Sequence, residues 1–190
     1  RVACGCHGGV EIYDPVAGGA ALVVIDVKAR ALAVFRDPAT GEPRLACGCN
    51  RKVGIYDPVS GGEALIVLDS DDYVMALAVF ADPATGASRL ACASGGVRVF
   101  DLVAGGEALV VLEMGSEVYS LAFSTDPATG APRLASGSDD GKVLVFDPVA
   151  GGDALFVIKI RCTALSGFKD PATGAPRLVT SCGKVFDPVA

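Results

Sequence analysis

The chain has 190 residues, a formal net charge of −6 and a composition that is 51% hydrophobic but only 6% aromatic. This length allows one domain with a substantial core. The negative charge argues against affinity for the phosphate backbone of nucleic acids. No apolar run approaches the roughly 20 residues that a membrane-spanning helix needs. We therefore expect neither nucleic acid nor a membrane as a partner.

Three markers recur with one period of about 44 residues, which indicates an internal repeat. The pentapeptide Asp-Pro-Ala-Thr-Gly starts at Asp37, Asp82, Asp126 and Asp170. An aromatic residue precedes Asp14, Asp57, Asp101, Asp147 and Asp187. An arginine opens an apolar stretch at Arg1, Arg44, Arg89, Arg133 and Arg177. The chain is predicted to be a single domain with repeats 1–43, 44–88, 89–132 and 133–176 and a partial repeat 177–190.

Each unit contains four short apolar segments, and the second unit serves as the example. Its segments, in chain order, are Leu45 to Cys47, Val53 to Tyr56, Ala64 to Leu68, and Val74 to Phe80. They are rich in valine, leucine and aromatic residues and are bounded by Gly, Pro, Asp or Ser, which is typical of strands. In the turn from Asp37 to Gly41, aspartate can accept from backbone N–H groups, proline presets φ, and glycine allows the left-handed position. The pattern predicts antiparallel hairpins, four strands to a unit.

The best-matching stretch, Leu134 to Asp147, resembles the second and third strands of WD-repeat proteins, with Phe146-Asp147 where that family usually has Trp-Asp. The preceding stretch, Val118 to Ser124, resembles the family's innermost strand. The family's Gly-His pair is absent, and Gly115-Ser116 stands nearest to its place. The resemblance implies an all-β propeller of four-stranded antiparallel blades, built from divergent repeats.

Alignment of the units gives strands B-C-D, then three complete A-B-C-D sets, then A-B-C, where A is innermost and D outermost. This order predicts 18 strands, or about 4.5 blades, in a five-bladed propeller or a segment of a larger ring. The first blade would lack its innermost strand and the last its outermost strand. We expect further sequence or another chain to complete the ring, because exposed strand edges invite pairing.

The sequence offers few groups for chemistry. Cys4, Cys6 and His7 lie close together, and Cys47 and Cys49 repeat the C-x-C spacing, but familiar structural zinc sites use longer spacings. At equivalent positions of the repeats, cysteine in one repeat is replaced by serine in another. This exchange indicates that these positions need a small residue on a tightly packed strand. We therefore predict no metal, no cofactor and no catalytic residue. The repeated arginine either pairs with the neighbouring turn aspartate or forms a ring that recognises an acidic partner.

The two edges of the blades differ in sequence. The A–B and C–D turns are nearly constant, whereas the B–C and D–A loops differ in every repeat, and variable loops on a constant scaffold are where recognition usually resides. The candidate partner-binding residues are charged or aromatic residues at this variable edge: Lys28, Arg30, Arg51, Lys52, Asp69, Asp71, Asp72, Tyr73, Glu113, Glu117, Tyr119, Asp139, Asp140, Lys159 and Arg161. The acidic second and third D–A loops and the basic first and fourth loops predict a bipolar rim.

These features predict a non-catalytic scaffold that binds other proteins within a larger intracellular assembly. We expect a cytoplasmic location, with cytoskeletal association left open, because an odd number of cysteines in a repeat pattern favours a reducing compartment. The alternative is a propeller that binds small ligands or glycans, although only Tyr73 and Tyr119 could supply aromatic platforms at the variable edge. An enzyme ranks third.

Overall fold

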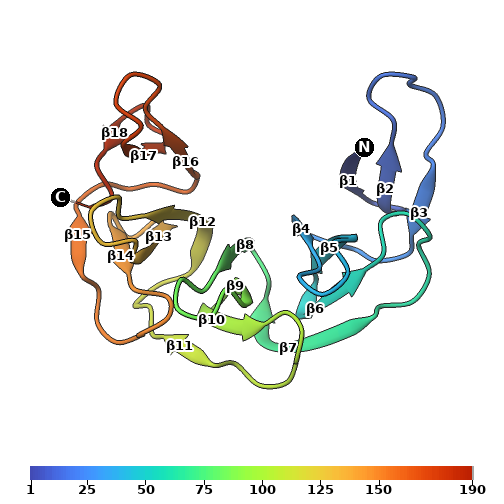
Figure 1. Cartoon of the computed structure of the whole chain (residues 1–190), viewed down its shortest axis with the longest axis horizontal. Helices are drawn as coiled ribbons and strands as arrows, with labels where there is room; N and C mark the ends of the chain where they lie inside the picture. Colours follow the sequence, from blue (N-terminus) through green and yellow to red (C-terminus); the bar gives the residue numbers. More distant parts are fainter. Residues whose placement is uncertain (190) are drawn as a thin grey trace.

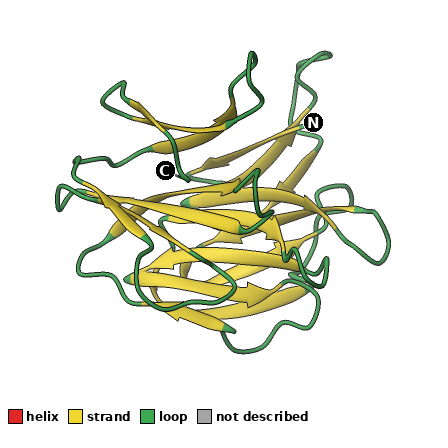
Figure 2. Ribbon diagram, turned by 60° about the vertical axis from the view of Figure 1, so that its left-hand side comes forward, coloured by secondary structure: helices red, strands yellow, loops and turns green. Residues whose placement is uncertain are grey.

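The computed structural model describes residues 1–189 as strands, turns and loops, and this part of the chain contains no helix that could cross a lipid bilayer (Figures 1 and 2). The strands within these residues are β1 Val2–Cys6, β2 Gly9–Tyr13, β3 Val23–Ile25, β4 Ala31–Arg36, β5 Pro43–Gly48, β6 Asn50–Tyr56, β7 Ile66–Tyr73, β8 Ala76–Ala81, β9 Ser88–Ser94, β10 Gly96–Asp101, β11 Val110–Leu112, β12 Val118–Thr125, β13 Pro132–Ser138, β14 Val143–Phe146, β15 Phe156–Ile158, β16 Leu165–Lys169, β17 Pro176–Thr180 and β18 Val185–Phe186.

These strands pair in chain order into five antiparallel sheets: blade 1 (β1–β3), blade 2 (β4–β7), blade 3 (β8–β11), blade 4 (β12–β15) and blade 5 (β16–β18). The sheets stand side by side in an arc that is open between β1 and β16 (Figure 1). Strands β4, β8 and β12 lie towards the centre of the arc, and β3, β7, β11 and β15 lie towards its circumference. The predicted order of strands, with an incomplete first and last blade, is confirmed across the described residues.

The sequence repeat and the blade are out of phase by one strand. Strand β4 lies before Arg44, the marker that opens the second repeat, yet it pairs with β5 of that repeat, from Ala31 opposite Gly48 to Arg36 opposite Pro43. The same offset recurs at β8 and β12. Each repeat therefore supplies three strands of one blade and the innermost strand of the next.

Hydrophobic cores fill the junctions between consecutive blades. In β9, Leu90 and Cys92 belong to a cluster with Val53 of blade 2, whereas Ala91 and Ala93 belong to a cluster with residues of blade 4. This division follows from the alternation of side chains along a strand. Equivalent clusters join blade 1 to blade 2 and blade 4 to blade 5. The apolar residues of each repeat thus hold neighbouring blades together.

The Asp-Pro turns have the chemistry that their sequence predicts. The Asp37 carboxylate accepts from the backbone N–H groups of Ala39 and Thr40 at 3.0 and 3.4 Å. The Gly41 N–H donates to the Asp37 carbonyl at 2.7 Å, and Gly41 has a φ of 73°. The same side-chain bond to the second residue after the aspartate recurs at Asp82, Asp126 and Asp170.

The repeated arginine forms ion pairs with these turn aspartates. The pairs are Arg44 with Asp37, Arg89 with Asp82, Arg133 with Asp126 and Arg177 with Asp170, at 3.4–3.7 Å. Arg89 and Arg177 also pair with Asp101 and Asp187, the aspartates that begin the C–D turns. The interpretation that the repeated arginine pairs with the neighbouring turn aspartate is therefore confirmed at these four positions. The ion pairs link each arginine to a turn at one edge of the blades.

The turn aspartates lead us to expect that the fold is sensitive to acid. Hydrogen bonds from the backbone N–H groups of Ala39 and Ala84 hold the pKa values of Asp37 and Asp82 below the ordinary 3.8. A carboxylate with a lowered pKa in the folded state stabilises it above the unfolded pKa, and this contribution is lost as the pH falls through the folded value. We expect the melting temperature to be nearly constant down to about pH 4 and then to fall steeply.

Circular dichroism melts across this pH range measure the effect. The variant Asp82→Asn keeps an acceptor for the turn but cannot titrate, so its melting temperature should change less between about pH 4 and about pH 2.5. An identical acid profile in the variant and the parent chain would contradict the role of Asp82.

Two segments predicted as variable loops are strands in the structure. Residues 50–52, predicted as a B–C loop, open β6, and residues 69–73, predicted as a D–A loop, end β7. The reason is a register in which Asn50 pairs with Tyr73 and Lys52 pairs with Asp69 across a bulge. Arg51 lies in this bulge with a φ of 61°. Long-range pairing thus overrides the loop-like charge of both segments.

Candidate protein-docking surface

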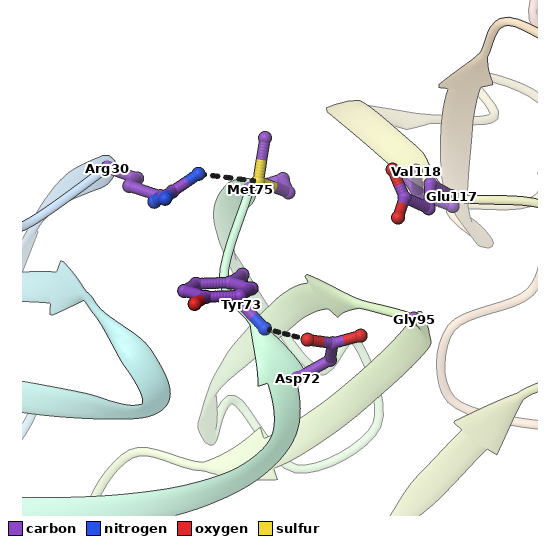
Figure 3. A pocket seen from close by; sticks show the side chains of 7 residues that line it. All are labelled: Arg30, Asp72, Tyr73, Met75, Gly95, Glu117 and Val118. Atoms are coloured by element: carbon purple, nitrogen blue, oxygen red, sulfur yellow. Dashed lines mark hydrogen bonds between the residues drawn. The ribbon is translucent and has the colours of Figure 1, made fainter.

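Three blades form a hollow of about 140 Å³ at the variable edge, near the centre of the arc. Its lining residues are Arg30, Asp72, Tyr73, Met75, Gly95, Glu117 and Val118 (Figure 3). Arg30 precedes β4, Asp72 and Tyr73 end β7, Met75 precedes β8, and Glu117 precedes β12. Residues about one repeat apart in the sequence therefore converge here because the blades are arranged around a common centre.

The Arg30 side chain extends from the loop before β4 to contact Tyr73, at the end of β7, and Met75, just before β8. Its guanidinium lies 4.5 Å from the centre of the Tyr73 ring, a cation–π contact, and its Nη1 lies 4.0 Å from the Met75 sulfur. The Arg30 and Met75 backbone N–H groups donate to the carbonyls of Gly48 and Ala93. The side-chain contacts are therefore built on backbone that the sheets hold in place.

Two carboxylates give the hollow an acidic character. Asp72 accepts from the Tyr73 backbone N–H at 2.7 Å, and Glu117 accepts from the Tyr119 hydroxyl at 2.8 Å. The bond to Glu117 also raises the pKa of the Tyr119 phenol. Glu117 lies across the hollow from Arg30 (Figure 3). The hollow thus offers two carboxylates, one guanidinium and one aromatic ring within a single exposed depression.

The structure separates the other candidate residues into different places. Asp69 and Asp71 face the circumference, where Asp71 pairs with Arg98, and Glu113 lies at the next junction along. Asp139, from a B–C loop, pairs at 3.8 Å with Arg161 of the predicted bipolar rim, so these two charges neutralise each other.

One of the remaining candidates stabilises a turn, and the others are exposed to solvent. Asp140 accepts from Ser138 and from the Lys142 backbone N–H, which is a turn role. The other four candidates are exposed and do not line the hollow: Lys28, Arg51, Lys52 and Lys159.

The sequence did not identify Met75 and Val118 as lining residues, and it placed Gly95 in a variable B–C loop without making it a candidate. Met75 and Val118 were assigned to innermost strands, and an apolar residue at the start of a strand carries no signal of exposure at an edge. Their shared position, at or just before the first residue of β8 and β12, is the one pattern that could have identified them.

A second hollow, of about 470 Å³, lies between blades 4 and 5 at the edge of the constant turns. Phe123, Asp126, Phe168 and Pro176 are among its lining residues, and the Phe168 side chain is exposed. The sequence placed no candidate here because the turns that surround it are uniform from repeat to repeat.

Three of the cysteines, Cys47, Cys92 and Cys162, are buried. Burial raises the pKa of the Cys47 thiol to about 12 and that of Cys92 to about 11, so both thiols stay protonated at neutral pH. All seven cysteines are free, and the described residues contain no group of three or more His, Cys, Asp or Glu side chains arranged to hold a metal ion.

No protein-family model and no curated protein sequence matches the chain. Two crystal structures of BBS1N in complex with ARL6DN, one soaked with lead and one with mercury, match 97% and 99% of it, with TM-scores of 0.71 and 0.72. The chain has a β-propeller fold. Sequence identity to both is 14%, so the likeness concerns the fold alone. The propeller chain described here spans 60% and 61% of the length of these solved chains.

Proposed function

We propose that this chain is a non-catalytic scaffold, built from divergent WD-type repeats, that binds a partner protein at its variable edge. The convergence of Arg30, Tyr73 and Glu117 from separate repeats into one hollow carries the proposal. A constant set of turns fixes the blades, while four of the residues that differ between repeats, Arg30, Asp72, Tyr73 and Glu117, meet at one place. Variable residues on a constant scaffold are where partner binding usually resides. BBS1N, which shares the fold, was crystallised in complex with another protein.

The proposal includes a cytoplasmic setting within a larger assembly. All seven cysteines are free thiols, a state that a reducing compartment maintains. The glycan-binding alternative needs an open aromatic face on which a sugar can stack. Arg30 already covers the Tyr73 ring, which favours protein recognition over stacking against a sugar.

Photo-crosslinking at Met75 tests the proposal without disturbing the contact between Arg30 and Tyr73. The chain has two methionines, Met75 and Met114, so Met114→Leu followed by labelling with photo-methionine places the reactive group in the hollow. The initiator methionine is removed, so that position 75 carries the only photo-methionine of the chain. We expect a discrete protein adduct from cells that express this labelled chain. The control carries Met75→Leu, Met114→Leu and Val16→Met, which moves the probe to an exposed C–D turn.

Arg30→Glu in the labelled chain should reduce the adduct about tenfold or more, because it removes a cation–π contact and reverses a charge at the hollow. Equal adducts from Met75 and from position 16, or an adduct unchanged by Arg30→Glu, would contradict docking at the variable edge. Glycan-array binding that Tyr73→Ala abolishes, with no protein adduct, would establish the alternative.

A further inference from the structure

At the circumference of the arc, each outermost strand exposes a valine and is directly preceded by an exposed leucine. These eight side chains, which we call the outer belt, are 43–57% exposed: Leu22, Val24, Leu65, Val67, Leu109, Val111, Leu155 and Val157. The alternate residues Ile25, Leu68 and Leu112 are buried in the cores between blades. Packing of the blades therefore explains one side of each outermost strand and leaves an apolar pair uncovered on the other.

A repeated apolar pattern on a surface marks a binding site more often than scattered single residues do. The belt of this chain includes a hollow of about 420 Å³ at the junction of blades 2 and 3. Its lining residues include Val67 and Asp69 of blade 2 and Phe100 and Glu107 of blade 3. The hollow thus joins an apolar wall to carboxylates from both blades.

The same arrangement recurs one blade further on. A hollow of about 300 Å³ between blades 3 and 4 is lined at the equivalent positions by Val111, Glu113, Phe146 and Asp153. The five acidic residues that line the two hollows are exposed: Asp69, Asp71, Glu107, Glu113 and Asp153. One of them, Asp71, is paired with the guanidinium of Arg98, which also lines the first hollow. Both hollows therefore present negative charge beside apolar surface.

The wall of each hollow also includes residues of an edge strand. Strands β7 and β11 are the last strands of their sheets, so each is hydrogen-bonded to a neighbouring strand on one side only. An extended peptide can add to such an edge through backbone hydrogen bonds, while its alternate side chains enter adjacent pockets.

We propose that the outer belt docks an extended protein segment in which apolar side chains alternate with lysine or arginine. The apolar side chains lie beside Val67 or Val111, and the basic side chains reach the carboxylates at each end of the hollow. A second copy of this chain would bring an identical acidic belt to this surface, so its charge opposes self-association belt to belt. The surface is separate from the hollow around Arg30, and it can be tested independently of the proposed function.

The probe is a short fluorescent peptide in which valine alternates with lysine. Two control peptides separate charge from apolar contact: one alternates serine with lysine, and the other alternates valine with glutamate. Fluorescence anisotropy measures affinity for the full chain, and hydrogen exchange locates the protected amides. We expect the valine–lysine peptide to bind about tenfold more tightly than either control, since each control lacks one of the two interactions. Protection should appear in β7 or β11.

The variant chain carries Val67→Ser, Glu107→Gln, Val111→Ser, Glu113→Gln and Asp153→Asn, all exposed positions, and should lose most of this affinity. Glu42→Gln, an exposed position in an A–B turn, is the matched control for a lost charge and should bind as the parent chain does. Equal binding of the valine–lysine and serine–lysine peptides would overturn the proposal, as would protection confined to the hollow around Arg30. A concentration-dependent dimer that the variant abolishes would assign the belt to a second copy instead.

Discussion

Leu90→Ala is expected to lower the free energy of unfolding by about 2–5 kcal/mol, the usual cost of removing a buried leucine side chain without filling its place. Leu90 has no exposed surface and belongs to the cluster that joins blades 2 and 3. The variant loses contacts to both blades, so the effect should include a weakened junction as well as a weakened sheet. Urea unfolding followed by circular dichroism should show a lower midpoint.

Leu109→Ala is the matched control, because it makes the same chemical change at a side chain that is 56% exposed in the outer belt. Surface substitutions away from caps and cores usually alter stability by within about 0.5 kcal/mol. If Leu109→Ala were as costly as Leu90→Ala, the junction between blades 2 and 3 would not be the core that the structure describes.

Gly137→Ala is expected to destabilise the junction of blades 4 and 5 by about 1–3 kcal/mol, as overpacked sites usually do. A Cβ at position 137 would lie 2.7 Å from the Cys162 carbonyl oxygen and 3.1 Å from Cγ of Leu165. The Cys162 N–H donates to the Ser138 carbonyl, and the Leu165 N–H donates to the Ser120 hydroxyl. The segment cannot move away without breaking bonds on both sides.

Thermal and urea unfolding of Gly137→Ala should be compared with those of Gly115→Ala. Position 115 lies before β12, and a Cβ there would meet no atom within 4 Å. Alanine at that position should therefore be neutral or slightly stabilising, since it also restricts the unfolded chain. The close approach at Gly137 would be disproved if the two variants unfolded at the same midpoint.

Local chemistry was the part of this fold that the sequence could predict. The turn at Asp37 depends on residues within five positions of one another, and its proline, aspartate and glycine act in the same way wherever they recur. Short apolar segments bounded by Gly, Pro, Asp or Ser, such as Leu45 to Cys47, predicted the strands. The strand order followed from aligning the units with the strands of WD repeats, which the sequence resembles, so the blades could be assigned without any knowledge of the long-range contacts in this chain.

Pairing across the blade was harder to predict. The acidic segment that ends at Tyr73 has the composition of a loop, and only its pairing with Asn50 makes it a strand. Variability between repeats identified Asp71 and Asp72 together, but neighbouring residues on a strand point to opposite sides. Asp71 therefore pairs with Arg98 at the circumference, while Asp72 lines the central hollow.

The offset between repeat and blade also determines how such an array can lengthen by duplication. A crossover within any Asp-Pro-Ala-Thr-Gly turn inserts one unit directly after an innermost strand. The first three strands of the inserted unit complete the sheet that this innermost strand begins, and its last strand begins the next sheet. Every insertion of one unit therefore adds one blade with the same hairpin on both sides of the splice, and no new type of connection is required. A single unit removed from the array would lose the other three strands of the sheet to which its last strand belongs. These repeats can thus multiply as parts of an array more readily than they can be inherited singly.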